Sequence, residues 1–278
     1  MPYLTTDRAV CLLEGEQIVS RSGVYSFIHT YEHPASGRKV FLCGMSHVGQ
    51  KDYYRVIRDC LAGCDFVLYE PISLTGRYKR RPPMGEEIED IEDIDINEAI
   101  VFAILAYYIR LEEVFGFCGS PELTLEGKVF KEFYERENWI HADLLPDVDS
   151  EDSFEYSPSE ALRKHISRLP KARRLEIFYF FASRVMRMEE RTFTKRDFAW
   201  DLTALDSQKD LFKILVGSTL QKKRDRKCFE VFDSVVEQHN PGIVGIKFGV
   251  AHMPYQRRLL ETRGYKLVGS KKVCCVRL

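Results

Sequence analysis

Blocks of hydrophobic and polar residues near the N-terminus predict a strand, a helix and a second strand in succession. An apolar run at 40–43 predicts a short buried strand, which Gly44 interrupts. Apolar residues then recur at helical spacing from 52 to 61. A second apolar run, at 66–69, predicts a buried strand that ends at an acid, Glu70. A parallel crossover of this kind brings both strand C-termini to one edge of a sheet, where open α/β proteins bind ligands.

The same order of elements returns near the C-terminus. Residues 243–248 form a buried-type apolar run, and Pro254 suits the first turn of a helix that Gly264 ends. Further apolar runs at 266–268 and 273–276 predict closing strands, arranged as a terminal hairpin. Both ends of the chain therefore predict strand and helix units of one α/β sheet.

The stretch between these two units is mostly helical in its hydrophobic pattern. Before it, residues 24–31 and 39–43 flank a polar turn and predict an antiparallel hairpin, so the sheet is expected to be mixed. No stretch has the composition of a linker that would mark an independent domain. We therefore predict a single α/β domain over residues 1–278, with a mixed central sheet and a mostly helical insertion at about 84–240.

Composition and charge narrow the class of protein. Apolar residues make up 45% of the 278 positions, which is typical of a globular chain. The 41 basic residues nearly balance the 42 acidic ones, so no general field attracts nucleic acid or an anionic membrane. The longest apolar run, at 99–109, is too short to span a membrane, and the N-terminus lacks a signal-peptide pattern. A cytoplasmic protein with reduced thiols is expected, and a homodimer is left open.

Two Gly-x-x-His segments carry the candidate chemistry, GMSH at 44–47 and GVAH at 249–252. Each lies between an apolar strand and an amphipathic helix, a placement that chance rarely repeats within one chain. Glycine there is expected to let the backbone turn sharply at the sheet edge, and the helix N-terminus that follows favours a neutral imidazole. A neutral imidazole suits a metal ligand or a general base. The alternative is that each histidine only caps its turn by hydrogen bonding.

These motifs resemble the TraB/PrgY/Tiki family, which is related to the erythromycin-esterase and ChaN-like fold. That family includes a membrane-linked metal-dependent protease and a protein that blocks a peptide pheromone. Both ends of the chain carry the resemblance, whereas the helical middle is poorly matched. The matching segments are GMSH at 44–47, FVLYE at 66–70, WIHAD at 139–143, KKRDRKCFEVF at 222–232 and VGIKFGVAH at 244–252.

The resemblance implies a divalent-metal-dependent hydrolase that cleaves a peptide or related acyl bond of a peptide or small-molecule substrate. The implied ion is manganese, cobalt or zinc. Two alternatives stay open. One is a metal-free esterase with a histidine base, as in the erythromycin-esterase relatives, and the other is a protein that sequesters a peptide or small ligand without turnover.

Roles follow for the residues that match the family motifs. His47 and His252 are expected to hold the divalent ion, with Glu70 as the third ligand or as the general base. Such a set leaves positions for water and substrate, and the ion lowers the pKa of its bound water. Arg224 is expected to stabilise the oxyanion of the transition state. Arg226 competes for this place, and the alternative for either arginine is an ordinary solvated charge.

Two further features have open roles. Asp143 is expected to be another ligand, an outer-sphere partner of a ligating histidine, or a buried structural acid. The segment at 77–95 carries basic residues followed by acidic ones, which predicts a solvated loop. The alternative is that this loop forms a lid beside Glu70.

Overall fold

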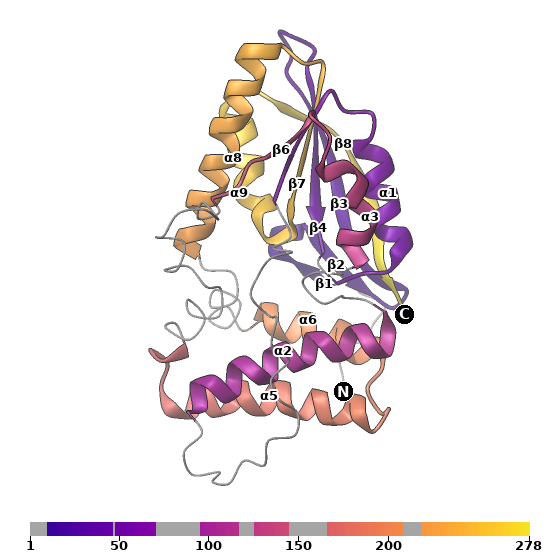
Figure 1. Ribbon diagram of the computed structural model, residues 1–278, viewed down its shortest axis with the longest axis vertical. Coiled ribbons are helices and arrows are strands. Elements are labelled where there is room, and N and C mark those ends of the chain that lie inside the picture. Colours follow the sequence, from indigo (N-terminus) through magenta and orange to yellow (C-terminus); the bar gives the residue numbers. More distant parts are fainter. Residues whose placement is uncertain (1–9, 47, 71–94, 117–124, 145–165, 208–217) are drawn as a thin grey trace. The chain divides into compact units, whose positions relative to one another are not determined.

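A computed structural model of the chain describes residues 10–46, 48–70, 95–116, 125–144, 166–207 and 218–278 (Figure 1). The chain divides into two compact units. The first, called the sheet unit, consists of Met1–Pro71, Leu125–Leu144 and Lys195–Leu278, and the second of Ile72–Thr124 and Leu145–Thr194. That the whole chain behaves as one domain stays a prediction.

The sheet unit is a mixed α/β structure, as the sequence predicts. Its strands lie in the order β1-β2-β3-β4-β7-β5-β6, and β8 pairs with β3. The pairs β4–β7, β7–β5 and β5–β6 are parallel. The remaining pairs are antiparallel. The strands are β1 (Val10–Leu12), β2 (Gln17–Ser20), β3 (Gly23–Glu32), β4 (Lys39–Met45), β5 (Phe66–Tyr69), β6 (Trp139–His141), β7 (Ile243–Gly249) and β8 (Lys266–Arg277).

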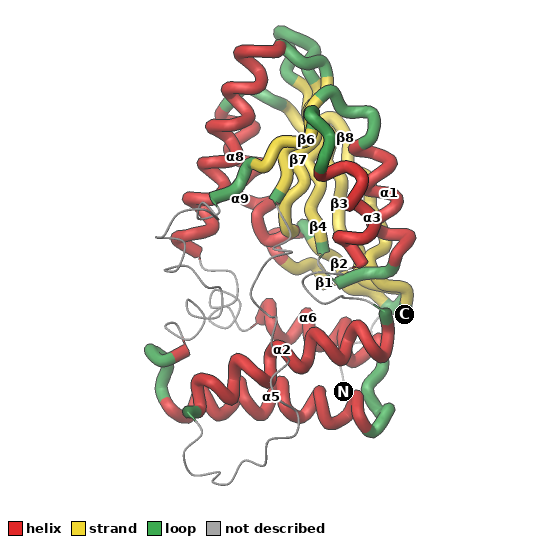
Figure 2. The backbone as a smooth tube through the Cα atoms, viewed as in Figure 1, coloured by secondary structure: helices red, strands yellow, loops and turns green. Residues whose placement is uncertain are grey.

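Helices cover both faces of this sheet (Figures 1 and 2). Side chains along β7 point alternately to the two faces of the sheet. Ile246 and Phe248 belong to the buried core under α8 and α9. Gly245 lies instead against Leu61 of α1, and Lys247 against Phe130 of α3. The helical segments of the unit are η1 (Leu13–Gly15), α1 (Lys51–Leu61), α3 (Leu125–Tyr134), α6 (Lys195–Ser207), α8 (Ser218–His239), η4 (Val250–His252) and α9 (Met253–Thr262).

The second unit contains two long helices, α2 (Ile96–Phe115) and α5 (Lys171–Glu189). Their buried residues meet, and the rings of Tyr107 and Phe181 lie edge to face with centroids 5.4 Å apart. Asp95 caps the start of α2, because its side chain accepts the backbone N–H of Asn97 at 3.0 Å. This unit confirms helices in the middle of the chain.

The register of three parallel strands decides which segments share an edge of the sheet. β7 pairs with β4 on one side, where Met45 lies opposite Gly249, and with β5 on the other, where Tyr69 lies opposite Lys247. The crossover from β4 through α1 to β5 therefore skips one position, and β7 fills it. Both Gly-x-x-His segments begin at the same sheet edge, on adjacent strands.

Two local predictions were wrong. Gly44 does not turn the backbone, because it lies inside β4. A Cβ atom there would lie 2.8 Å from Cγ of Met253, so glycine serves the close approach of α9 to the sheet. The terminal hairpin is absent as well, since β8 is one strand of 12 residues that pairs along β3.

A buried carboxylate links β2, β3 and α9. Glu16 is 1% exposed, and its Oε2 lies 2.7 Å from Nε2 of His29. Its Oε1 accepts from Nη1 of Arg257 at 2.6 Å, while Nε of Arg257 donates to the Tyr31 hydroxyl at 3.0 Å. Burial alone would raise the pKa of Glu16, but the bonds from His29 and Arg257 outweigh it and lower the pKa below the usual 4.5.

We expect Glu16→Gln to lower the free energy of unfolding by about 3 kcal/mol at pH 7, because Arg257 and His29 lose a buried charged partner. A lowered carboxyl pKa stabilises the fold above pH 4.5, and this contribution is lost as the pH falls through the folded-state pKa. The deficit of the variant should therefore shrink in acid. Urea unfolding at several pH values measures it. Glu14→Gln removes a largely exposed acid and is the control, with a change below about 0.5 kcal/mol. Equal effects of both variants would contradict the prediction.

Candidate functional site

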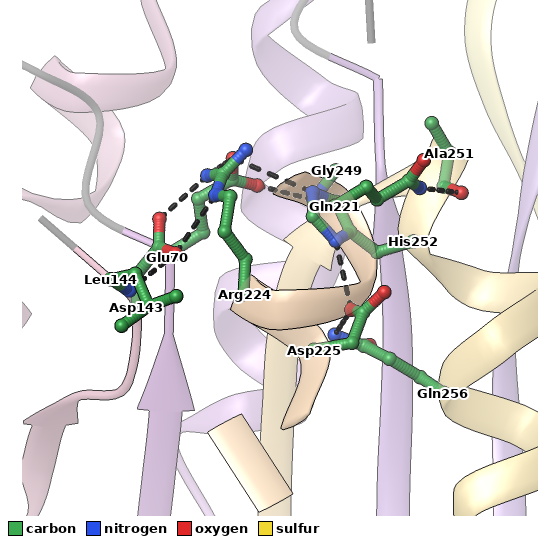
Figure 3. Close-up of polar contacts among 10 residues, drawn as sticks. All are labelled: Glu70, Asp143, Leu144, Gln221, Arg224, Asp225, Gly249, Ala251, His252 and Gln256. Carbon is green, nitrogen blue, oxygen red and sulfur yellow. Dashed lines mark hydrogen bonds and ion pairs between the residues drawn. The ribbon is translucent and has the colours of Figure 1, made fainter. Parts of the chain in front are cut away.

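The candidate site lies at the carboxyl edge of the parallel strands. Glu70 directly follows β5, Asp143 follows β6, and Gly249 ends β7. Because these neighbouring strands are parallel, their C-terminal ends meet at one edge. Figure 3 shows the polar side chains that gather there.

Arg224 of α8 joins the two acids of this edge. Its Nε donates to Oδ1 of Asp143 at 2.8 Å, and its Nη2 donates to Oδ2 of Asp143 at 2.5 Å and also to Oε1 of Glu70. The backbone N–H of Gly249 donates to the other Glu70 oxygen at 2.6 Å. Burial would lower the pKa of Arg224, but the two carboxylates raise it above its usual range, so the guanidinium stays charged.

His252 lies beside Glu70 and is held by Asp225, a carboxylate of α8. Its Nδ1 is 2.8 Å from Oδ1 of Asp225, which also accepts from Nε2 of Gln256 at 2.8 Å. Because Oδ1 already accepts from the amide N–H, we assign it the acceptor role toward the ring as well and place the ring hydrogen on Nδ1. The lone pair of the imidazole is then on Nε2, which lies 3.9 Å from Oε1 of Glu70.

Asp225 is fully buried, which sets its electrostatics. Burial raises the pKa of its carboxyl group above the usual range, and the bonds from His252 and Gln256 oppose this rise. Among the described residues, Oδ2 of Asp225 has no hydrogen-bond partner, and neither has Oε1 of Gln256. A buried oxygen without a donor favours the neutral carboxyl.

The structure brings most of the sequence-predicted residues together. Glu70, Arg224, His252 and Asp143 form one continuous set of contacts. Arg226 is exposed on α8 and makes none of these contacts. His47 lies outside the described residues, as does the charged segment at 77–95 except for its last residue.

Three polar residues of the site were missed from the sequence. Asp225 holds His252, Gln256 supports Asp225, and the amide of Gln221 donates to the carbonyl of Ala251. A signal for Asp225 was present. Asp225 lies three positions before the buried Cys228, on the same face of the helix. An acid therefore occupies an otherwise apolar face. Its partner was not evident, since His252 is 27 positions away.

His252 and Glu70 are suitable ligands for a divalent ion, which would need at least one further ligand. Nε2 of His252 and Oε1 of Glu70 lie 3.9 Å apart, and these two residues would hold the ion, which would supply Lewis-acid chemistry there. Asp225 holds the opposite ring nitrogen, as carboxylates do for metal-bound histidines. Within the described ranges, no three His, Cys, Asp or Glu side chains are grouped to hold an ion.

Comparison of the chain with protein-family models, with curated proteins and with solved structures found no match. The resemblance to the TraB/PrgY/Tiki family therefore stays a hypothesis that rests on the motif residues. No helix in the part of the chain that the structure describes is long and apolar enough to cross a membrane.

Proposed function

We propose that this protein is a divalent-metal-dependent hydrolase that cleaves a peptide or related acyl bond. The observation that carries the proposal is the orientation of His252. Asp225 fixes its Nδ1, which turns the Nε2 lone pair toward Glu70 at 3.9 Å. This places a base and a carboxylate 3.9 Å apart at the sheet edge, where α/β proteins bind ligands.

The charge of the site favours a cation. Three carboxylates, those of Glu70, Asp143 and Asp225, surround one guanidinium, that of Arg224. Even with Asp225 neutral and His252 uncharged, the carboxylates exceed the guanidinium by one. A divalent ion held by His252 and Glu70, with His47 as the further ligand that the sequence motif suggests, would acidify a water molecule and polarise the scissile carbonyl.

The protein groups have separable roles in this proposal. Glu70 has two alternative roles: it is a ligand of the ion, or its Oε1, which faces His252, accepts a proton from the attacking water. Arg224 is positioned by Asp143 through Nε and Nη2, and its Nη1 makes no hydrogen bond with the described residues. That nitrogen is the donor available to a developing oxyanion. His252 supplies the Nε2 lone pair to the ion, and Asp225 holds the ring in place through Nδ1.

A metal-free hydrolase is the second candidate, and a specific contact favours it. The Asp225–His252 pair is the arrangement of an oriented general base, which activates water without a cation. Arg224 already neutralises part of the charge of Glu70. In this version Glu70 positions the water, and His252 takes its proton.

Metal binding separates these functions. We expect purified protein to bind Mn²⁺, Co²⁺ or Zn²⁺ in calorimetry, and His252→Ala to weaken the affinity by at least 10-fold, because one of the described donors is lost. His239→Ala, at the exposed end of α8, is the control and should leave the affinity unchanged. Equal affinity of the two variants would overturn the assignment of His252 as a ligand.

A peptide library then decides among the activities. Product that requires the ion and disappears with chelator supports the metal hydrolase. Product that survives chelator supports the metal-free version instead. A peptide that is retained but not cleaved would replace both by a sequestering function.

A further inference from the structure

A second group of polar side chains lies in the antiparallel part of the sheet, on β3, on β8 and at the residue that precedes β2. Ser270 on β8 lies directly opposite His29 on β3, and its Oγ is 2.7 Å from Nδ1 of the imidazole. The other ring nitrogen, Nε2, is 2.7 Å from Oε2 of Glu16. A hydroxyl, an imidazole and a carboxylate are therefore joined in one chain of hydrogen bonds.

Exposure to solvent decreases along this chain of hydrogen bonds. Ser270 is exposed, whereas His29 is 6% exposed and Glu16 is 1% exposed. The hydroxyl is therefore open to a molecule from solvent, while the imidazole and the carboxylate are shielded behind it. A cross-strand bond between serine and histidine does not need a buried carboxylate, whose burial costs free energy. The arrangement is the one in which a base and its orienting acid activate a hydroxyl.

The bonds of Glu16 decide which nitrogen of His29 carries the hydrogen. Burial would raise the pKa of Glu16, but the bonds from His29 and Arg257 lower it below its usual value. Nη1 of Arg257 donates to Oε1 at 2.6 Å, which leaves Oε2 to the imidazole. An ionised carboxylate only accepts hydrogen bonds, so Nε2 of the neutral ring carries the hydrogen. Nδ1 then holds a lone pair, and the Ser270 hydroxyl donates to it.

Neighbouring side chains on the same side of β3 and β8 favour an ester with an apolar acyl group. The Phe27 ring is partly exposed and stacks on the His29 ring, with centroids 5.6 Å apart. Lys272 lies two residues beyond Ser270, opposite Phe27. Its Nζ is 4.5 Å from the centroid of the Tyr25 ring. The rings provide an apolar surface beside the hydroxyl, and the ammonium group provides positive charge for a developing oxyanion.

We propose that Ser270 is a nucleophile that His29 activates and Glu16 orients, and that it forms an acyl-serine with esters of apolar acids. The hydrogen bonds of 2.7 Å on both sides of the imidazole and the exposure of the hydroxyl support this assignment. It is independent of the proposed metal hydrolase, because it shares no residue with the site at the carboxyl edge of the parallel strands.

The reaction balances with water as the second reactant. The Ser270 oxygen attacks the carbonyl carbon of the ester while His29 takes the hydroxyl proton on Nδ1. The C–O bond to the alcohol breaks, the alcohol takes that proton from His29, and an acyl-serine remains. Water then gives a proton to Nδ1 and attacks the acyl carbon, the bond to Ser270 breaks, and the serine oxygen recovers the proton. One ester and one water thus give one carboxylic acid and one alcohol.

An alkyl fluorophosphonate probe tests the nucleophile. We expect the full chain to be labelled on Ser270, with fluoride as the leaving group, at the same rate with and without a metal chelator. Tryptic peptide 267–271 reports the label, because Ser270 is its only hydroxyl residue and a modified Lys271 would prevent cleavage. Ser270→Ala, at an exposed position, should abolish the label, and His29→Gln should slow labelling by at least about 100-fold. A label on another residue, or no label at all, would overturn the proposal.

The matched control is Ser36. It is also exposed, and its Oγ lies 3.3 Å from Nδ1 of His33, but no carboxylate among the described residues bonds the other nitrogen of that ring. Ser36 should remain unlabelled, and Ser36→Ala should leave the labelling rate of Ser270 unchanged. Equal labelling of the two serines would contradict the assignment, since it would show that the buried carboxylate adds nothing.

Glu16→Gln tests the orienting carboxylate. Arg257 requires an oxygen acceptor, so the NH₂ group of the glutamine is expected to face Nε2 of His29, which moves the ring hydrogen to Nδ1. The Ser270 hydroxyl then loses its acceptor, and labelling should slow by about 100-fold or more below the melting temperature of the variant. Nitrogen-15 chemical shifts of His29 report the tautomer separately from stability. An unchanged labelling rate would overturn the role assigned to Glu16.

Discussion

Replacing Arg224 with alanine is expected to destabilise the protein by about 3–5 kcal/mol at pH 8 and to lower any hydrolytic kcat/KM by about 100- to 1000-fold. The stability loss follows from burial, because the Asp143 side chain is 1% exposed and would lose its charged partner, keeping only the backbone N–H of Leu144 as a donor to Oδ1. The activity loss follows from the missing donor for the oxyanion. Thermal unfolding measures the first effect, and initial rates measure the second.

The matched control for this variant is Arg226→Ala. Arg226 lies two positions along the same helix, carries the same charge and is exposed, so its removal should change stability by less than about 0.5 kcal/mol. Arg224→Lys keeps the charge but not the fork that joins two carboxylates, and it should recover only part of the loss.

The loss of stability expected for Arg224→Ala depends on pH. Without the guanidinium, the like charges of Glu70 and Asp143 repel each other, and this repulsion destabilises the fold only while both carboxylates are ionised. The deficit of Arg224→Ala should therefore be smaller in acid than at pH 8, and Glu70→Gln added to it should restore part of the stability. A deficit that is constant with pH, or one equal to that of Arg226→Ala, would contradict the role assigned to Arg224, which is to join Glu70 and Asp143.

The fold was predictable where hydrophobic pattern and turn residues agree. The segments that became β4, β5 and β7 were marked by short, mainly apolar runs and α1 by helical spacing of apolar residues, so local pattern was enough to place them. The place of β7 between β4 and β5 was not predictable, because strand order depends on pairing between residues some 200 positions apart.

The wrong prediction at the C-terminus has a local cause. Gly269-Ser270 looks like a turn between two short apolar runs. Both residues instead pair with β3, where Thr30 lies opposite Gly269 and His29 opposite Ser270. An irregularity in register between Thr30 and Tyr31 lets the strand continue. Pairing with a long neighbouring strand thus overrides the turn signal.

The site was partly visible in the sequence for a chemical reason. Residues at the ends of parallel strands, such as Glu70, are marked by the abrupt change from apolar to charged. Arg224 was hard to distinguish from Arg226, since both occur in one basic run and only helix orientation separates them. Asp225 needed its partner to be interpreted, and hydrogen bonds between α8 and η4 are a property of the tertiary structure.

Replacing Asp225 with asparagine should separate activity from stability. We expect no loss of melting temperature and a modest gain at pH 7, with metal affinity reduced by about 10- to 100-fold and activity by about 100-fold or more. The gain follows from the raised pKa of Asp225, because its ionisation opposes folding, and this effect vanishes below the usual carboxyl pKa of 3.8. Asparagine keeps the shape of the side chain and removes the charge.

The loss of affinity and activity follows from the histidine ring. An asparagine amide can turn its NH₂ group toward Nδ1 of His252, which moves the ring hydrogen to Nε2 and removes the lone pair that faces Glu70. Nitrogen-15 chemical shifts of His252 report this tautomer directly, without a substrate. Asp233→Asn, an exposed position of the same helix, is the control and should leave the shifts and metal affinity unchanged. If Asp225→Asn kept both the tautomer and the affinity, Asp225 would be a buried structural acid, and the orientation of His252 would need another cause.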